Sequence, residues 1–186
     1  KDGVYNDADQ GIIGCGQPTF NWGWNNTFNY KNFDFSFFVV GFHGFDIYNA
    51  THQMGYNLIK SQQVAGVTPM RELLNRWTPT NTNTNIPGFV NGGTENKDFF
   101  STRFVENGSF IKMKSITLGY TLPETACRAL GITNLRVYAS VQNPFHITNY
   151  SGLDPEATMG SPLVQGVDWG SYPNSRNYLI GLNFSF

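Results

Sequence analysis

Two acid pairs are the first candidates for chemistry in this chain. Asp154 and Glu156 flank Pro155, and paired carboxylates are what glycoside hydrolysis requires. A proline-containing loop does not fix the separation of the two groups, so the favoured interpretation is a structural turn. Asp7 and Asp9 could ligate a cation, but the other positions of a calcium loop are missing around them. No metal site is predicted.

The histidines and cysteines lack the spacing of a reactive centre. His43, His52 and His146 are far apart, with neither an HExxH motif nor a Ser/His/Asp arrangement beside them. Cys15 and Cys127 show no CxxC or Cys/His spacing, and nothing in the sequence supports a disulfide between them. We therefore expect no enzymatic activity, no metal and no cofactor.

The composition is unusual for a soluble domain. Aromatic residues make up 16% of the 186 residues and charged residues only 13%, against about 25% charged on average. No apolar run approaches the roughly 18 to 20 residues of a membrane-spanning helix. The net charge is -1 and the Lys and Arg residues are scattered singly, so there is no basic patch to favour nucleic acid as a partner. Apolar residues dispersed by alternation are instead what a membrane β-strand needs, because only one of its faces meets lipid.

Alternating apolar and polar residues predict five β-strands with two unlike faces. The segments are Thr19–Tyr30, Phe33 towards Tyr48, Ser109–Leu122, Leu135–Gln142 and Arg176–Phe186. In the third segment, Ile111 and Met113 fall on the opposite parity from Ile116, which predicts a bulge, or an exit from the bilayer, near Lys112 and Lys114.

The connections between these strands alternate in length. Lys31–Asn32 and Pro123–Asn134 are short, whereas 49–107 and 148–175 are long, with a weak helical pattern at Arg71–Trp77 in the first long stretch. Up-and-down strands would place both short connections at one end and both long ones at the other, as in outer-membrane barrels with short periplasmic turns and long extracellular loops. The same counting places residues 1–18 at the long-loop end.

The last segment has the length of a membrane strand. At about 3.3 Å per residue and a tilt of about 40°, Arg176–Phe186 rises roughly 28 Å, against an apolar band of about 25 Å. Aromatics gather towards the strand ends, as in interfacial girdles: Trp22 and Trp24 outside, and Tyr30, Phe33, Tyr120 and Phe184 at the periplasmic side. Five strands cannot close a barrel, and open edges in lipid would leave backbone groups unpaired, so more strands must come from elsewhere.

Several motifs, in the right order, resemble the C-terminal region of the SusC/RagA family of TonB-linked outer-membrane proteins. They are DIYNA (46–50), LNRWTP (74–79), RFVENGSF (103–110), KSITLGYTLP (114–123), LRVYASVQN (135–143), YSGLDPE (150–156), GVDWGSYP (166–173) and GLNFSF (181–186). One departure is Pro144, where the family usually has an aliphatic residue, so the upper part of that strand is expected to bend.

The resemblance implies an all-β fold: residues 1–186 would be the last five or so antiparallel strands of a barrel of about 22 strands with long extracellular loops. The plug, the TonB box and the earlier strands would lie outside this chain. The implied function is TonB-dependent import of oligosaccharides or peptides across the outer membrane of a Gram-negative bacterium, beneath a SusD-like surface lipoprotein. The alternative is a non-transport β-domain that binds glycans at the cell surface.

Three sets of residues are candidates for function within this scheme. Contacts to substrate or lipoprotein are expected from loop residues, although the aromatics could equally hold the loops together: Trp77, Tyr150, Asp154, Trp169 and Tyr172. A polar lumen wall is expected from Asn25, Asn29, Arg136, Gln142 and Asn183. The alternating C-terminus resembles the signal recognised by the outer-membrane insertion machinery: Tyr178, Ile180, Leu182, Phe184 and Phe186.

Overall fold

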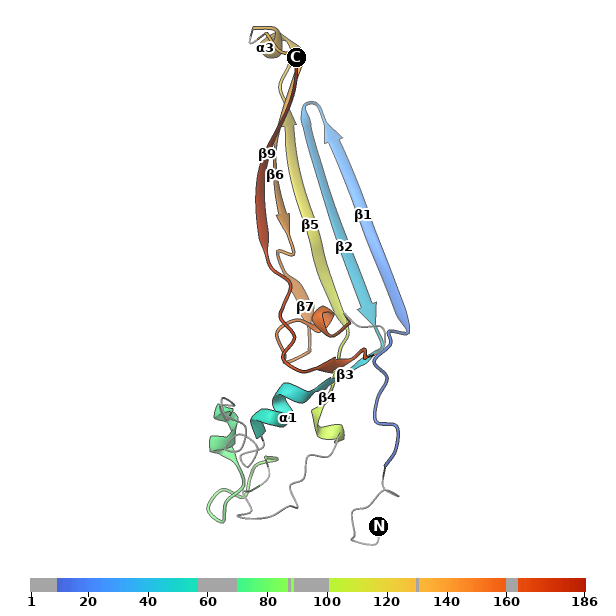
Figure 1. Cartoon of the computed structure of the whole chain (residues 1–186), viewed down its shortest axis with the longest axis vertical. Coiled ribbons are helices and arrows are strands. Elements are labelled where there is room, and N and C mark those ends of the chain that lie inside the picture. The colour runs from blue at the N-terminus through green and yellow to red at the C-terminus, as the bar shows by residue number, and fades with distance from the viewer. Residues whose placement is uncertain (1–9, 57–69, 87, 89–100, 130, 160–163) are drawn as a thin grey trace.

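A long antiparallel sheet dominates the computed structural model, which describes residues 10–56, 70–86, 88, 101–129, 131–159 and 164–186 (Figure 1). Its strands follow the order β1-β2-β5-β6-β9, with β7 paired to β5 beyond the end of β6. Their bounds are β1 Phe20–Tyr30, β2 Phe33–His43, β5 Phe110–Thr121, β6 Asn134–Gln142, β7 His146–Thr148 and β9 Asn177–Ser185. All five predicted strands are confirmed, and each lies antiparallel to its neighbour.

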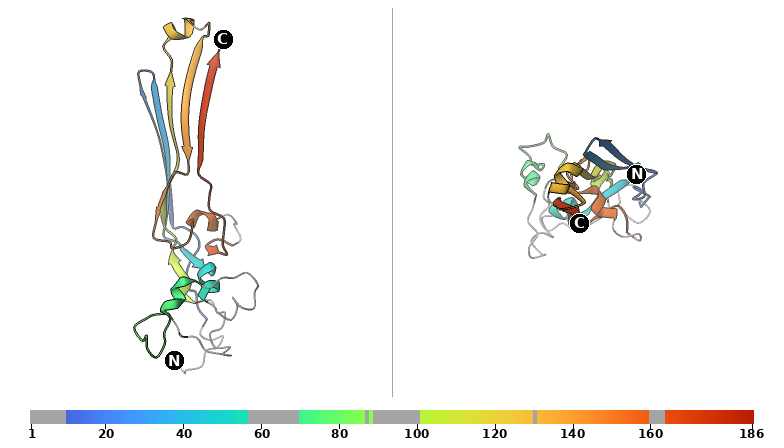
Figure 2. Two further views of the ribbon diagram at one scale, coloured as in Figure 1. Left: turned by 90° about the vertical axis from the view of Figure 1, so that its left-hand side faces the viewer. Right: turned by 90° about the horizontal axis from the view of Figure 1, so that it is seen from above.

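The two ends of the sheet differ as the sequence predicts. At one end, here called the turn end, β1 and β2 join through Lys31 and Asn32, and β5 and β6 join through the short helix α3 (Glu124–Ala129). The described parts of both long connections and residues 10–18 lie at the other end, the loop end (Figures 1 and 2). There the Asp46 N–H donates to the Cys15 carbonyl at 2.7 Å. Residues 1–9, also predicted for this side, lie outside the described residues.

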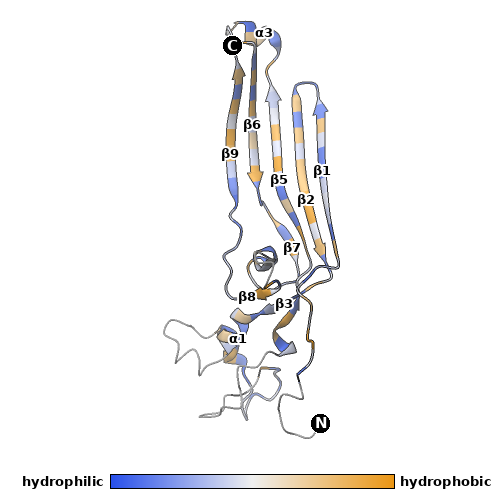
Figure 3. Cartoon of the chain, turned by 45° about the vertical axis from the view of Figure 1, so that its right-hand side comes forward, coloured by the Kyte–Doolittle hydropathy of each residue, from blue (hydrophilic) through white to orange (hydrophobic). Residues whose placement is uncertain are grey.

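The sheet has two unlike faces, set by the register of its strands. Trp24 lies opposite Val39, Phe35 opposite Leu118 and Ala139 opposite Ile180, so apolar side chains share one face, here called the outer face. Ile180 is 85% exposed and Leu118 is 50% exposed. Figure 3 shows bands of apolar and polar residues along the strands of the main sheet. None of the described helices is long and apolar enough to span a membrane.

A β-bulge at Lys114 restores this alternation in β5. Phe38 pairs with Ser115, but Val39 pairs with Met113, so Lys114 is the extra residue. Met113 and Ile111 therefore return to the outer face, which confirms the predicted bulge. On the other side of β5, β6 stops at Gln142, and Asn143, with φ of 50°, donates its N–H to the Lys114 carbonyl at 2.9 Å. Pro144 follows, and pairing resumes in β7, so the strand is interrupted where the proline predicts a bend.

A second, small sheet, which the sequence analysis does not predict, lies within the long connections at the loop end. β3 (Asp46–Asn49) pairs antiparallel with β4 (Val105–Asn107) and parallel with β8 (Val167–Asp168). Strands of two to four residues are too short for alternation to reveal. The long connections also hold α1 (Ala50–Tyr56), η2 (Arg71–Asn75), η3 (Thr102–Phe104) and η4 (Pro155–Met159). η2 lies within the predicted Arg71–Trp77 pattern.

The buried core lies where these connections fold over the inner face of the main sheet. It comprises Val40, Phe45, Ile47, Phe110 and Tyr150, with Phe42 packed against it. Val40, Phe42 and Phe110 share the inner face with Asn25, as the strand register shows. At the loop end the inner face is therefore covered by the long connections and carries the buried core.

Candidate functional site

Four charged side chains attach the second long connection to the main sheet. They are Lys112, Lys114, Asp154 and Glu156, called here the lysine-carboxylate cluster. Lys112 Nζ contacts Asp154 Oδ2 at 2.8 Å and Glu156 Oε2 at 2.7 Å, and Lys114 Nζ pairs with Glu156 Oε1. The Lys112 and Asp154 side chains are each 3% exposed. The bulge brings Lys114 towards the same carboxylates as Lys112, so it positions the cluster as well as the outer face.

The cluster keeps both carboxylates ionised despite their burial. Burial would raise the pKa of Asp154, but hydrogen bonds from Lys112 and from the backbone N–H groups of Asn174 and Glu156 outweigh this effect and lower it. Burial acts on Glu156 in the same direction, and its bonds to Lys112 and Lys114 lower its pKa. Two ammonium groups balance two carboxylates, so the cluster is neutral and fully paired. It is a structural anchor, in keeping with the turn predicted for Asp154–Glu156.

A third carboxylate, that of Asp168, holds the turn that follows β8. Its Oδ2 accepts from the Tyr150 hydroxyl at 2.5 Å, and its Oδ1 accepts from the N–H groups of Gly170 and Ser171, each at 2.9 Å. Burial and the bond to Asp168 raise the pKa of Tyr150, so the phenol remains a proton donor. Asp168 thus fixes the start of the 169–175 segment.

Glu106 joins the first long connection to the second. Its Oε2 accepts from the Ser151 N–H and its Oε1 from the Ser151 hydroxyl, both at 2.8 Å, and Oε1 also accepts from Asn49 Nδ2 at 2.9 Å. His52 Nδ1 lies 3.7 Å from the same oxygen. The two long connections therefore form one assembly.

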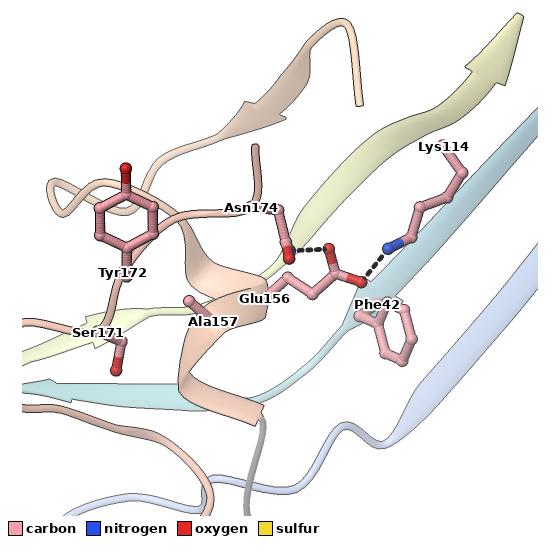
Figure 4. A pocket seen from close by; sticks show the side chains of 7 residues that line it. All are labelled: Phe42, Lys114, Glu156, Ala157, Ser171, Tyr172 and Asn174. Carbon is pink, nitrogen blue, oxygen red and sulfur yellow. Dashed lines mark hydrogen bonds and ion pairs between the residues drawn. The ribbon is translucent and has the colours of Figure 1, made fainter. Parts of the chain in front are cut away.

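Lys114 and Glu156 of the lysine-carboxylate cluster also line an open pocket of about 760 Å³. Figure 4 shows the Glu156 carboxylate between Lys114 and Asn174, with Tyr172 on the opposite side of the η4 helix turn. Asn174 Nδ2 donates to Glu156 Oε2 at 2.8 Å. The lining comes from β2, β5, η4 and the 169–175 segment: Phe42, Lys114, Glu156, Ala157, Ser171, Tyr172 and Asn174.

The predicted loop contacts separate into buried and exposed residues. Tyr172 is 88% exposed and lines the pocket. Trp169 (59% exposed) and Trp77 (47% exposed) do not line it. Tyr150 and Asp154 are only 5% and 4% exposed. Both side chains bond to other residues of the loop end, and a contact from either one to substrate or lipoprotein stays a prediction. Sequence reasoning missed Lys112, Lys114 and Asp168, although two lysines at a break in alternation were a usable signal.

The five residues predicted to line a lumen share one face. Asn29 lies opposite Asp34, Asn25 opposite Phe38, Gln142 opposite Ser115, and Arg136 opposite Asn183, which places all of them on the inner face. Arg136 Nε also donates to Asp34 Oδ1 at 2.9 Å, crossing β5 above Gly119. A lumen role for the set stays a prediction.

The predicted C-terminal signal residues lie on the outer face of β9. Tyr178, Ile180, Leu182 and Phe184 oppose Val141, Ala139, Val137 and Leu135 of β6, and Phe186 follows the last residue of the strand. All five are exposed, in agreement with a lipid-facing edge. Their recognition by an insertion machinery stays a prediction.

Within the described part of the chain, no group of three or more His, Cys, Asp or Glu side chains could hold a metal. Cys15 is exposed and Cys127 is buried, and both are free thiols. His43 accepts a hydrogen bond from Trp22 Nε1 at 3.1 Å, at the loop end of the outer face. Asp7 and Asp9 lie outside the described residues.

An open antiparallel sheet with one exposed apolar face, short turns at one end and folded long loops at the other defines a segment of a transmembrane β-barrel. No protein-family model matches the sequence. TonB-dependent receptor P3 of Formosa agariphila is 36% identical over the whole chain, which spans 18% of that receptor. TonB-dependent receptor SusC of Bacteroides thetaiotaomicron is 32% identical over 88% of the chain, which spans 15% of it.

Solved structures give the same result. The RagAB peptide importer in its closed-closed state superposes with a TM-score of 0.76 and 27% identity over 92% of the chain, covering 18% of the importer chain. Its open-open state gives a TM-score of 0.73 over 91% of the chain. In sequence and in fold, the chain corresponds to the C-terminal barrel strands of TonB-dependent receptors of the SusC/RagA family.

Proposed function

We propose that this chain is the C-terminal barrel segment of an outer-membrane importer that takes up oligosaccharides or peptides, driven by TonB acting on a plug outside this chain. The observation that carries the proposal is the exposed apolar outer face in a chain related throughout to TonB-dependent receptors. Both edges of the main sheet, β1 and β9, are open and would pair with the remaining strands of a longer protein in a Gram-negative outer membrane.

A SusD-like surface lipoprotein is the proposed partner at the loop end. Support comes from the relationship to SusC and RagAB and from exposed apolar side chains on the loops, including Leu74 and Trp77. Such a lid would cover the mouth of the barrel during loading.

Import is tested by deleting the gene of the full-length protein and measuring growth on single carbon or nitrogen sources. We expect growth on one class of oligosaccharide or peptide to be lost, to return with the wild-type gene, and to be lost again when TonB is removed. A strain that takes up every such nutrient without this protein contradicts the proposal.

The competing function is a non-transport glycan-binding domain at the cell surface. That reading requires a chain that is soluble by itself, whereas the outer face exposes large apolar residues along its full length. If residues 1–186 alone stay monomeric in detergent-free buffer and unfold cooperatively, the competing function is favoured.

A further inference from the structure

We propose that Asn26 of β1 hydrogen-bonds to a polar side chain of the strand that adds to the open edge of β1, and that this bond sets the register between the two strands. The inference rests on the proposed function, in which that strand belongs to the same longer protein. The chain spans 18% of TonB-dependent receptor P3, so a protein of that length has ample sequence to supply the strand.

Asn26 is the one amide on the outer face of the described strands β1, β2, β5, β6 and β9. It lies opposite Phe37, which places it on the same face as Trp24 and Phe28. The other outer-face positions within the bounds of these strands carry apolar or aromatic side chains, glycine, or His43 at the loop end. His43 already accepts a hydrogen bond within the chain. Asn26 therefore differs from its whole surroundings.

The position of Asn26 along β1 is near the middle of the apolar band. The strand begins at Phe20 and ends at Tyr30. At about 3.3 Å per residue and a tilt of about 40°, Asn26 lies roughly 10 Å from Tyr30 and roughly 15 Å from Phe20, within an apolar band of about 25 Å. Water is absent at that depth, so an amide without a hydrogen-bond partner is costly there.

The described part of the chain supplies no such partner. The Asn26 side chain forms no hydrogen bond with any described residue. Its neighbours on the outer face are the rings of Trp24, Phe28 and Phe37. The Phe37 ring lies 5.1 Å from that of Trp24 and 6.3 Å from that of Phe28, between centroids. Because aromatic rings occupy the side towards β2, a partner reaches the amide from the open edge of β1.

The backbone of β1 favours a close approach from that edge. Lys31, with φ of 53°, and Asn32 form a two-residue turn, which makes Tyr30 and Phe33 a hydrogen-bonded pair. Such pairs recur at every second residue, so the N–H and C=O groups of Asn26 point to β2. The added strand then meets Asn26 as a non-hydrogen-bonded pair, in which the Cα atoms are about 4.5 Å apart and the side chains are closest.

A hydrogen bond at this place discriminates between registers. A shift of two residues keeps every side chain on its own face, so apolar faces alone do not exclude it. With Asn26 as the one amide, the shift would leave it and its partner opposite apolar side chains. A single buried Asn specifies register in coiled coils for the same reason. The partner is therefore an outward-facing side chain with a hydroxyl or an amide group.

Urea unfolding of the full-length protein in lipid vesicles tests the bond. Asn26→Leu removes the amide and leaves its partner unpaired in the apolar band, so we expect the folding equilibrium constant to fall by about tenfold or more. Asn25→Leu is the matched control, because Asn25 is the same residue one position away on the inner face. It should change the constant by less than about threefold.

The opposite order is expected for an amide that meets lipid alone, because Leu would then replace an unsatisfied polar group. An Asn26→Leu variant at least as stable as Asn25→Leu would therefore overturn the inference. Folding of each variant is verified by heat-dependent mobility in gel electrophoresis.

Disulfide scanning identifies the partner. In a full-length background without native cysteines, including Cys15→Ser and Cys127→Ala, Asn26→Cys is combined with single cysteines along the strand next to β1. The position that cross-links most within one molecule should carry a hydroxyl or amide in the wild type. Changing that residue to Leu should remove most of the cost of Asn26→Leu.

An apolar wild-type residue at that position, or cross-linking of Asn26→Cys only between two molecules, would overturn the inference. The second result would mean that a second copy of the protein covers Asn26. Growth of the deletion strain tests import separately, so failure of the register bond is distinguishable from failure of the proposed function.

Discussion

Gly119 and Gly181 leave room for neighbouring side chains to cross the inner face of the main sheet. A Cβ on Gly119 would lie 2.4 Å from Asp34 Oδ1 and 2.5 Å from Arg136 Nη2, and a Cβ on Gly181 would lie 2.3 Å from the Tyr138 ring. The Arg136 guanidinium in turn lies 4.9 Å from the centre of that ring. The missing side chains let an ion pair and a ring cross the inner face next to the backbone.

Gly119→Ala should separate Asp34 from Arg136. We expect a loss of about 1 to 3 kcal/mol in the free energy of unfolding, the usual range for overpacking. Urea unfolding of the full-length protein in detergent measures it. In an Asp34→Ala background the contact with the carboxylate is gone and Arg136, no longer held by the ion pair, can move away from the new methyl group, so the same change should cost clearly less. Equal costs in the two backgrounds would contradict this account of Gly119.

Acid should release the loop anchored by Asp154 and Glu156. Because the pKa values of both groups are lowered from ordinary values of 3.8 and 4.5, their contribution to stability is present above those values and is lost as the pH falls through the lower folded ones. Hydrogen exchange at residues 150–158, corrected for intrinsic rates, should accelerate below about pH 4 while strands β5 and β6 stay protected. Uniform protection down to about pH 2 would contradict the claim that the ionised Asp154 and Glu156 hold this segment in place.

At the scale of the elements, the β-bulge in β5 links the main sheet to the second long connection. Lys112 is 3% exposed in its side chain and Lys114 is 29% exposed, yet both bind the same connection. Removal of the buried partner leaves two carboxylates without their shared cation, whereas removal of the exposed one leaves Lys112 in place.

Lys112→Ala and Lys114→Ala therefore form a matched pair. Breaking a buried pair costs about 3 to 5 kcal/mol, and a partly exposed pair costs about 1 kcal/mol or less. Local opening of residues 150–158, measured by hydrogen exchange at neutral pH, should increase at least about a hundredfold in the first variant and less than about tenfold in the second. The reverse order would show that Lys114 carries the anchor.

The faces of β9 should respond differently to charge. Ile180→Arg puts a guanidinium on the outer face near the middle of the strand, where lipid makes it cost about 2 to 4 kcal/mol, while Asn183→Arg lies on the inner face and should cost little. Folding yield and urea midpoint in lipid vesicles measure the difference. Similar losses for both variants would mean that the outer face does not meet lipid.

The sequence predicted the elements whose pattern repeats over many residues. Alternation identified β1, β2, β5, β6 and β9 within a few residues, and its break at Met113 revealed the bulge. The small sheet β3-β4-β8 was missed because its strands are too short to show a period. The burial of Tyr150 and Asp154 was missed for another reason: it depends on Lys112 and Asp168, partners that only the fold brings near them.

At the scale of the whole molecule, the fold is one part of the wall of a β-barrel. Its hydrophobic core cluster lies at the loop end, and its strands expose apolar residues on one side and polar residues on the other. Open edges at β1 and β9 leave backbone groups that lipid cannot satisfy. The remaining strands, the plug and the lipoprotein belong to the proposal for the complete importer.

The outer face in contact with hydrocarbon is the central claim, and spin labels on the full-length protein in lipid vesicles test it most directly. Labels replace Leu118 and Ile180 on the outer face, or Asn29 and Asn183 on the inner face, and their collisions with oxygen and with a water-soluble nickel complex are compared. We predict that oxygen reaches the outer labels and nickel does not, with the reverse for the inner labels. Nickel access at Leu118 and Ile180 equal to that at Asn183 would contradict the account.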